Sequence, residues 1–388
     1  MSLVDSIAQH LPEYTAWRRD LHAHPEVGFE EHRTAALVAE RLTAMGIEVH
    51  TGIGGTGVVG VIRGKATGNT PRTVGLRADM DALPLTEANS FAHASQNPGR
   101  MHGCGHDGHT TMLLAAARHM AENRDFEGTV HLYFQPAEEL GAGAPAMQKD
   151  GLLQRFPADA VYALHNRPGM PVGHYGIRPG PMLAGVTFWD IHVQGKGGHA
   201  ARPEVTHDPV VCGAALISAL QSVVARNVSP HAQAVLSVTG METGRAYNVI
   251  PDGVRLFGTV RTFAPEVTEL VRERMERLAE SVASGFGCRA ALDFRVLTPP
   301  LINSAEHATR FADAVAGLVG EAKVERNMPA SMGGEDFAYF LQEVPGAFIN
   351  VGNGEQGADL HHPRYDFNDE AIPYGAAALV AVVRQELG

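Results

Sequence analysis

Residues 129–139, with the sequence TVHLYFQPAEE, combine a β-prone apolar run with an adjacent pair of carboxylates. The first six residues are mostly apolar and β-prone, which predicts a strand, and Pro136 ends the hydrogen-bonding ladder of that strand. Two carboxylates, Glu138 and Glu139, follow at once. This stretch therefore predicts a strand whose carboxyl end presents charged side chains.

The same arrangement recurs along the first half of the chain. Further strands are predicted over 58–62, 74–78 and 160–164, and a helix over 110–120. Asp79-Met80-Asp81 follows the second of these strands, and His165-Asn166 follows the third. Alternating strands and helices are typical of an α/β domain, in which ligands bind outside the carboxyl ends of the strands. We therefore expect three acidic or imidazole-bearing segments to converge at one edge of a sheet.

From about residue 186 the pattern changes. Strands are predicted over 187–193, 234–238, 254–263 and 289–296, with helices over 208–226 and 265–284. The order β-α-β-β-α-β is that of a ferredoxin-like unit. After Thr298 the α/β pattern returns, and 388 residues suit two domains. We predict a discontinuous α/β domain over 1–185 and 298–388 and an inserted α+β domain over 186–297.

Composition excludes several classes of protein. With 44% hydrophobic and 19% charged residues, the chain has enough apolar side chains to form a core, so disorder is not expected. The net charge is −12, and no basic stripe is visible, so a nucleic-acid partner is not expected. The 20 histidines are unusual and make metal chemistry worth testing.

The three cysteines also indicate a compartment. They are odd in number and far apart, which is not a disulfide framework, so we expect a reducing, cytoplasmic setting. The apolar run 210–220 is too short to cross a bilayer and is expected to be a buried helix. No export signal is visible, and no membrane association is expected.

Residues 102–109, HGCGHDGH, carry the sharpest chemical signal. Three imidazoles, a thiol and a carboxylate alternate with glycines that let the backbone turn tightly around one ion. Cys104 and His106 are the best-placed pair of ligands. The alternative is a polar loop before the helix, with Asp107 as its N-terminal cap.

The adjacent carboxylates Glu138 and Glu139 suggest a division of roles. They repel each other unless a cation or a shared proton compensates, so one can ligate a metal while the other acts as a general base. The alternative is a solvated surface pair. His165 is equally consistent with a core histidine, and the role of His361-His362-Pro363 is open in the same way.

Thiolate, imidazole and carboxylate together suit Zn, Mn, Ni or Co better than Mg or Ca. The candidate ligands outnumber those that one tetrahedral ion needs, so two neighbouring ions that activate water are expected. The residues alone therefore predict a dinuclear metallohydrolase.

Eight motifs in order along the chain resemble one known family. They are 20–26 (DLHAHPE), 77–84 (RADMDALP), 102–109, 135–139 (QPAEE), 195–200 (GKGGHA), 248–251 (NVIP), 333–337 (GGEDF) and 360–363 (LHHP). This set is similar to the hippurate hydrolase and N-acyl-amino-acid amidohydrolase branch of the aminoacylase and carboxypeptidase G family.

The resemblance implies a fold and a site. The fold would be an aminopeptidase-like α/β catalytic domain with an inserted ferredoxin-like dimerisation or lid domain. Glu138 would be the general base, and Asp79 and Asp81 would orient ligands. Asp107 and His109 stay without an assigned role. The implied metal ligands are Cys104, His106, Glu139, His165 and His361, with His362 in a variable position.

The resemblance also implies a reaction and further site residues. Two divalent ions, Mn or Zn first and Ni or Co as alternatives, would serve hydrolysis of an N-acyl or N-aroyl amino acid by metal-activated water. His199 would stabilise the oxyanion, from the partner subunit of a homodimer or tetramer. Asn248 and Gly334 would bind substrate.

Other readings stay open. Within the family, an N-acetyl-amino-acid or N-acetyl-diaminopimelate deacetylase and a dipeptidase share these motifs. From another class, Cys104 could be the nucleophile of a thiol hydrolase. A protein that binds metal or acyl-amino acids without catalysis would also carry the ligands, although the intact Glu138 argues against it.

Overall fold

The computed structural model describes residues 1–65 and 72–388. These divide into two compact units. Unit 1 comprises Met1–Met182, Ile302–Pro329 and Asp336–Gly388. Unit 2 comprises Leu183–Leu301 and Ala330–Glu335.

The boundaries differ from the predicted 186–297 by a few residues at each end of the insert, which spans Leu183–Leu301, and at one further segment. Ala330–Glu335 was predicted in the catalytic domain but belongs to unit 2. The reason is a set of backbone contacts: Ala184 N donates to Ser331 O and to Gly333 O, each at 3.0 Å. The chain thus returns briefly to unit 2 after unit 1 has resumed, which no local sequence pattern indicates.

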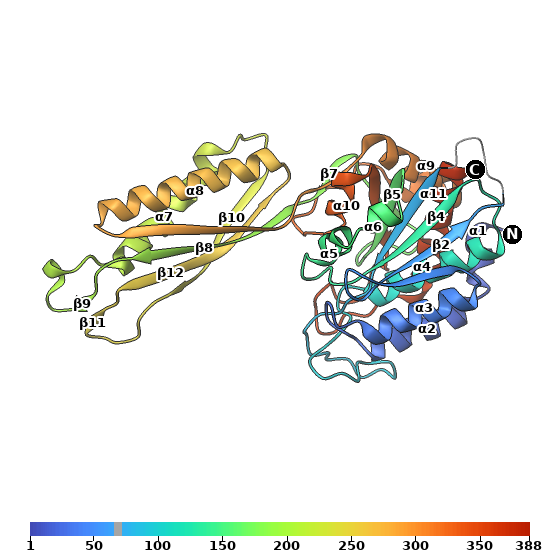
Figure 1. The fold of residues 1–388 in the computed structure, drawn as a ribbon, viewed down its shortest axis with the longest axis horizontal. Coiled ribbons are helices and arrows are strands. Elements are labelled where there is room, and N and C mark those ends of the chain that lie inside the picture. The colour runs from blue at the N-terminus through green and yellow to red at the C-terminus, as the bar shows by residue number, and fades with distance from the viewer. Residues whose placement is uncertain (66–71) are drawn as a thin grey trace. The chain divides into compact units, whose positions relative to one another are not determined.

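Unit 1 is built on an eight-stranded sheet in the order β1-β2-β4-β3-β5-β16-β6-β15. Strands β2, β4 and β5 of this sheet are labelled in Figure 1. Its central strands β4, β3, β5 and β16 run parallel, while β1 and β2 add antiparallel pairs at one edge. The strands are β1 Glu48–Ile53, β2 Gly57–Arg63, β3 Thr73–Asp79, β4 Thr129–Gln135, β5 Ala160–Arg167, β6 Tyr175–Gly176, β15 Val324–Glu325 and β16 Gly346–Gly352. Short strands β7 Gly180–Leu183 and β14 Leu301–Asn303 pair separately.

Nine α-helices are found in the described part of unit 1. They are α1 Leu3–Ala8, α2 Leu11–Ala23, α3 His32–Ala44, α4 His106–Glu122, α5 Gly143–Lys149, α6 Leu152–Arg155, α9 Ala305–Val319, α10 Ala338–Glu343 and α11 Ile372–Leu387. Helices α2, α3, α4, α9 and α11 share one hydrophobic core with the central strands. The predicted α/β class is confirmed, because β3, β4 and β5 are parallel neighbours with buried side chains.

One helix begins earlier than predicted. The sequence placed it from residue 110, with Asp107 as its cap only in the alternative of a polar loop, whereas α4 begins at His106 and its N-cap is Gly105. Gly105 has φ +93°, a left-handed conformation that glycine adopts at little cost. The histidine-rich segment is therefore partly the first turn of a helix, and Cys104 lies in the turn before it.

Unit 2 contains a four-stranded antiparallel sheet in the order β10-β12-β8-β13. The elements follow in the predicted order: β8 Gly185–Gln194, α7 Pro209–Asn227, β10 Ala234–Glu242, β12 Gly253–Thr262, α8 Pro265–Gly285 and β13 Arg289–Thr298. Helices α7 and α8 lie side by side over one face of this sheet (Figure 1). A small two-stranded sheet joins β9 Gly198–His199 to β11 Val249–Ile250.

Helix α7 has the predicted length but is less buried than the sequence suggested. This 19-residue helix has a mean hydropathy of 1.5, so by length and composition it could cross a membrane. Only a third of its most apolar stretch is buried in the structure. A single helix of this kind is weak evidence for a membrane, because core helices pass the same test. Cys212, Leu216, Leu220 and Val223 pack into the core of unit 2, as expected of an amphipathic surface helix.

Candidate metal centre

The polar segments predicted to converge do meet at one edge of the unit 1 sheet. Strands β4, β3 and β5 are parallel neighbours, so their carboxyl ends lie together. Asp79 ends β3, and Glu138 follows β4 by three residues. His165 lies near the end of β5, and α4 delivers His106 to the same place. The topology of the sheet thus gathers acids and imidazoles from four elements.

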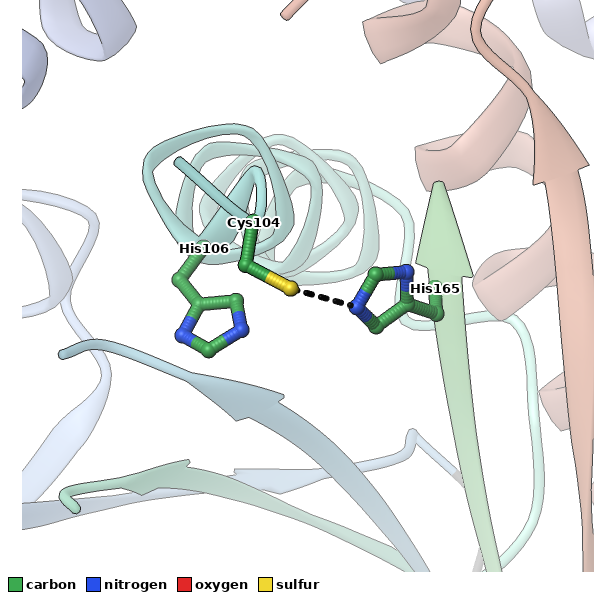
Figure 2. A group of neighbouring side chains, drawn as sticks. All are labelled: Cys104, His106 and His165. Carbon is green, nitrogen blue, oxygen red and sulfur yellow. Dashed lines mark hydrogen bonds between the residues drawn. The ribbon is translucent and has the colours of Figure 1, made fainter. Parts of the chain in front are cut away.

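Cys104 and His165 are in direct contact. Cys104 Sγ lies 3.4 Å from His165 Nε2, and Figure 2 shows His106 beside them at the start of α4. Candidate ligand atoms of these three side chains lie within 4.8 Å of one another. This spacing is suitable for a single ion held by a thiolate and two imidazoles.

Three further groups of side chains overlap with this one, and two of them contain predicted site residues from the Glu138-Glu139 pair. Cys104 forms a second group with Glu139 and His361, and His106 forms a third with Glu138 and Glu139, by the same 4.8 Å criterion. All five predicted metal ligands therefore belong to groups that share Cys104 or His106. Overlapping groups of this kind can hold two neighbouring cations.

Hydrogen bonds fix which imidazole nitrogen is available. His106 Nδ1 lies 2.9 Å from the carbonyl oxygen of Asp81, and His165 Nδ1 lies 2.7 Å from that of Asn166. A carbonyl only accepts hydrogen bonds, so each Nδ1 must be the donor. In the neutral rings the lone pair is then on Nε2, the atom that faces the cluster, as is usual for metal-binding histidines.

Two polar atoms at the centre lack hydrogen-bond partners. Among the residues that the structure describes, His106 Nε2 and Glu139 Oε1 are buried and accept or donate no hydrogen bond. They lie 3.9 Å apart. His361 Nε2 is 3.5 Å from Glu139 Oε1, an ion-pair contact without hydrogen-bond geometry. Because buried polar atoms are normally satisfied, this pair fits a site for a cation.

The electrostatics of the cluster favour a cation as well. Burial raises the pKa of the Cys104 thiol well above its usual value, and the Glu139 carboxylate adds to the effect. Burial would lower the pKa of His106, but Asp79 and the hydrogen bond to Asp81 outweigh it and hold that pKa well above normal. Without a metal both groups keep a proton. A divalent ion that binds to both groups displaces these protons and supplies positive charge in their place.

The chain matches the family described as Peptidase family M20/M25/M40 over residues 75–385. It is 39% identical to a hippurate hydrolase of Campylobacter jejuni over 378 residues, 97% of each chain. The chain belongs to peptidase family M20/M25/M40. It is also 41% identical to an N-acetyl-L-cysteine deacetylase of Bacillus subtilis, covering 92% of this chain and 83% of the other.

Solved structures agree with this membership of the M20/M25/M40 family. A putative aminohydrolase from methicillin-resistant Staphylococcus aureus has a TM-score of 0.92 at 34% identity, covering 100% of this chain and 99% of that one. The Bacillus subtilis YXEP protein, described as a dinuclear metal binding peptidase, has a TM-score of 0.85 at 33% identity, covering 98% and 99%. The predicted family is confirmed, and the protein is an amide-bond hydrolase.

In this M20/M25/M40 member, Asp81 holds the acidic pair in place. Its Oδ1 accepts a hydrogen bond from Glu138 N at 3.1 Å, and its Oδ2 accepts one from Glu139 N at 3.0 Å. The same carboxylate lies 3.2 Å from His106 Nδ1. One buried side chain thus orients groups from β4 and α4, in line with the supporting role that the resemblance implied.

Asp79 and His109 form a second supporting pair. His109 Nε2 accepts a hydrogen bond from Asn166 N at 2.9 Å, so its Nδ1 is the donor to Asp79 Oδ1 at 2.7 Å. Asp79 also receives a 2.7 Å bond from Arg77. Both nitrogens of His109 are therefore engaged, although it lies within ligand distance of Asp79 and His106.

The structure separates the two C-terminal histidines. His361 approaches Glu139, and its backbone N donates to Gly103 O at 2.8 Å. His362 Nδ1 instead accepts a bond from Arg364 N at 3.1 Å, and the side chain is exposed. Only His361 of the two belongs to a described ligand group.

The three remaining predicted site residues lie in unit 2. His199 pairs with Val249 between β9 and β11, and Ala200 N donates to Asn248 O at 3.1 Å, so His199 and Asn248 are neighbours. A Cβ added to Gly334 would lie 2.2 Å from Val186 Cγ2, which gives this glycine a packing role. Their roles toward substrate stay predictions.

Sequence reasoning missed a group of buried polar residues around the centre. Arg18 and His22 on α2 contact Asp107, and Asn166 donates to Cys104 O at 2.6 Å. His22 lies in the motif 20–26, but its contact with Asp107 was not predicted. A further local signal was the spacing of Arg18 and His22, four residues apart, which places both on one face of a helix.

Proposed function

We propose that this protein hydrolyses the amide bond of N-acyl or N-aroyl amino acids, such as hippurate, with two divalent metal ions. The observation that carries the proposal is the pair of ligand groups that share Cys104 at the carboxyl ends of β3, β4 and β5. Relatives named for hydrolysis of hippurate and of N-acetylcysteine support this substrate class. So does a neighbour described as a dinuclear metal binding peptidase.

The ligands would be the five side chains that overlap in these groups. Cys104, His106 and His165 would hold one ion, and Cys104, Glu139 and His361 the other. A thiolate with imidazoles and carboxylates favours Mn or Zn, with Ni or Co as alternatives. When bound, such ions polarise a carbonyl and make a water molecule more acidic.

The protein's own groups would then move the proton. Glu138 Oε2 lies 4.0 Å from His106 Nε2, and the Glu138 side chain is only 12% exposed. Its carboxylate would accept a proton from the attacking water and return it to the nitrogen of the leaving amino acid. Asp81, which binds the backbone N of Glu138, would keep that carboxylate at the site.

Unit 2 would contribute the remaining contacts in a homodimer. His199 would donate a hydrogen bond to the oxyanion of a partner subunit's site, and Asn248 and Gly334 would bind polar groups of the substrate. The cytoplasmic location inferred from the cysteines also stays a proposal.

A substrate panel tests the proposal directly. The protein is reconstituted with Mn, Zn, Co or Ni, and kcat/KM is measured for benzoylglycine, N-acetylcysteine, N-acetyldiaminopimelate, an indoleacetyl amino acid and a dipeptide. We expect the N-acyl amino acids to be cleaved and the dipeptide to be cleaved least. Preference for the dipeptide by tenfold or more would make the protein a dipeptidase instead.

Metal removal separates this proposal from a thiol hydrolase. Dialysis against a strong chelator is expected to abolish hydrolysis, and added Mn or Zn is expected to restore it. A Cys104 nucleophile would survive chelation, but the raised pKa of this buried thiol disfavours the reactive thiolate. Activity that persists after complete metal removal, verified by elemental analysis, would contradict the metal-dependent reaction.

A further inference from the structure

Helix α2 carries two fully buried cationic side chains that contact Asp107, the residue after the candidate ligand His106. Arg18 and His22 are each 0% exposed. His22 Nδ1 lies 2.8 Å from Asp107 Oδ2, and its Nε2 lies 3.2 Å from Glu87 Oε1. Burial would lower the pKa of His22, but these hydrogen bonds to Asp107 and Glu87 outweigh it and raise the pKa to about 9. His22 is therefore an imidazolium that donates from both nitrogens.

Arg18 extends the same network in two directions. Its Nη1 lies 3.5 Å from Asp107 Oδ2 and 2.9 Å from Asp366 Oδ1. Its Nε donates to Asp369 Oδ1 at 2.7 Å. We call Arg18, His22 and these four carboxylates, Glu87 included, the α2 network.

One end of the α2 network reaches the first turn of α4. Asp107 follows His106 directly, and the N-cap Gly105 supplies no side-chain hydrogen bond to this turn. Asp107 is 1% exposed, and its contacts with Arg18 and His22 tie the turn to α2. The position of the His106 ring is thus linked to α2.

The other end reaches the segment that carries His361. Asp366 is five residues beyond His361. The loop that carries Glu87 is fastened to the same segment, because Ala88 N donates to Pro363 O at 2.8 Å and Asn89 Nδ2 donates to Tyr365 O at 3.0 Å. His361 N in turn binds Gly103 O. The two segments that supply ligands from α4 and from the C-terminal part of unit 1 are therefore bound to one helix.

We propose that Arg18 and His22 are positioning residues that hold residues 104–107 and 361–366 at the separation the metal ions require. The proposal rests on the proposed function only in that the site binds divalent ions. Groups that orient metal ligands typically change metal affinity 10- to 100-fold when removed, without touching the ion. Arg18 and His22 would act on the ligand segments in the same way, but through the intermediate side chains of Asp107, Glu87 and Asp366.

The test measures Mn²⁺ affinity of the full chain by competition with a chromophoric chelator. His22→Gln keeps the size of the side chain roughly but removes the charge and one of the two donors. We expect it to raise the Mn²⁺ Kd roughly 10- to 100-fold. The matched control is His307→Gln, because His307 is also buried and bonded through Nδ1, but to Ser304 at the start of α9. The control should leave the Kd unchanged.

A second variant covers the case in which His22→Gln does not fold. Asp366→Asn removes the charge of one carboxylate that Arg18 contacts, at a side chain that is 35% exposed. It leaves the contacts of Asp107 with Arg18 and His22 in place. A several-fold rise in Kd is expected. Folded variants whose Kd equals that of the wild type overturn the positioning role, even if their melting temperatures fall. If the wild type itself binds none of Mn²⁺, Zn²⁺, Co²⁺ and Ni²⁺, the proposed function fails together with this inference.

Discussion

Replacing Glu138 with Gln is expected to lower kcat by about 10²- to 10⁴-fold, the range that general acid–base groups contribute. Gln has the same shape but cannot accept a proton from water. The metal content should stay near two ions per chain, because Glu139 rather than Glu138 shares a ligand group with Cys104 and His361. Steady-state kinetics with benzoylglycine and elemental analysis of the same sample make both measurements.

Glu127→Gln is the matched control. Glu127 is an exposed glutamate two residues before β4, the strand that leads to Glu138, so the same chemical change there should leave kcat unaltered. Turnover of Glu138→Gln near the wild-type rate would exclude the general-base role. Loss of turnover together with loss of an ion would instead make Glu138 a ligand, as its proximity to His106 and Glu139 allows.

The sequence could predict the site largely because its residues follow strands. Parallel strands align their carboxyl ends, so knowing that 74–78, 129–134 and 160–164 are strands was enough to bring Asp79, Glu138 and His165 together. Cys104 and His106 are two residues apart, so a short turn is enough to bring both side chains into one ligand group. Contacts that are local, or imposed by sheet topology, are visible in a sequence.

The rest depends on long-range packing that no local pattern encodes. Arg18 contacts Asp366 across 348 residues of chain, and nothing in either segment specifies the other. Ala330–Glu335 joins unit 2 through backbone hydrogen bonds, which are nearly independent of side-chain identity. The helix predicted from residue 110 begins at His106, because Gly105 in a left-handed conformation precedes it and no polar N-cap side chain marks its start.

Gly105→Ala is expected to lower the free energy of unfolding by about 2 to 4 kcal/mol, since a left-handed φ costs alanine about 1 kcal/mol and forced contacts in a packed interior add about 1 to 3. The added Cβ would lie 2.2 Å from Asn166 Nδ2 and 2.6 Å from Tyr365 Oη. Asn166 is 0% exposed and bonded to both Cys104 O and Tyr365 Oη, so it has little room to move.

Gly46→Ala separates the two contributions. Gly46 has φ +70° and nothing within 4 Å of an added Cβ, so it should lose only the backbone part, about 1 kcal/mol. Urea unfolding of the metal-free variants measures both losses. Because the displaced Asn166 adjoins His165, Gly105→Ala should also weaken Mn²⁺ binding, whereas Gly46→Ala should not. Equal losses of stability, with equal Mn²⁺ affinities, would show that the turn before α4 tolerates a side chain and does not fix the ligands.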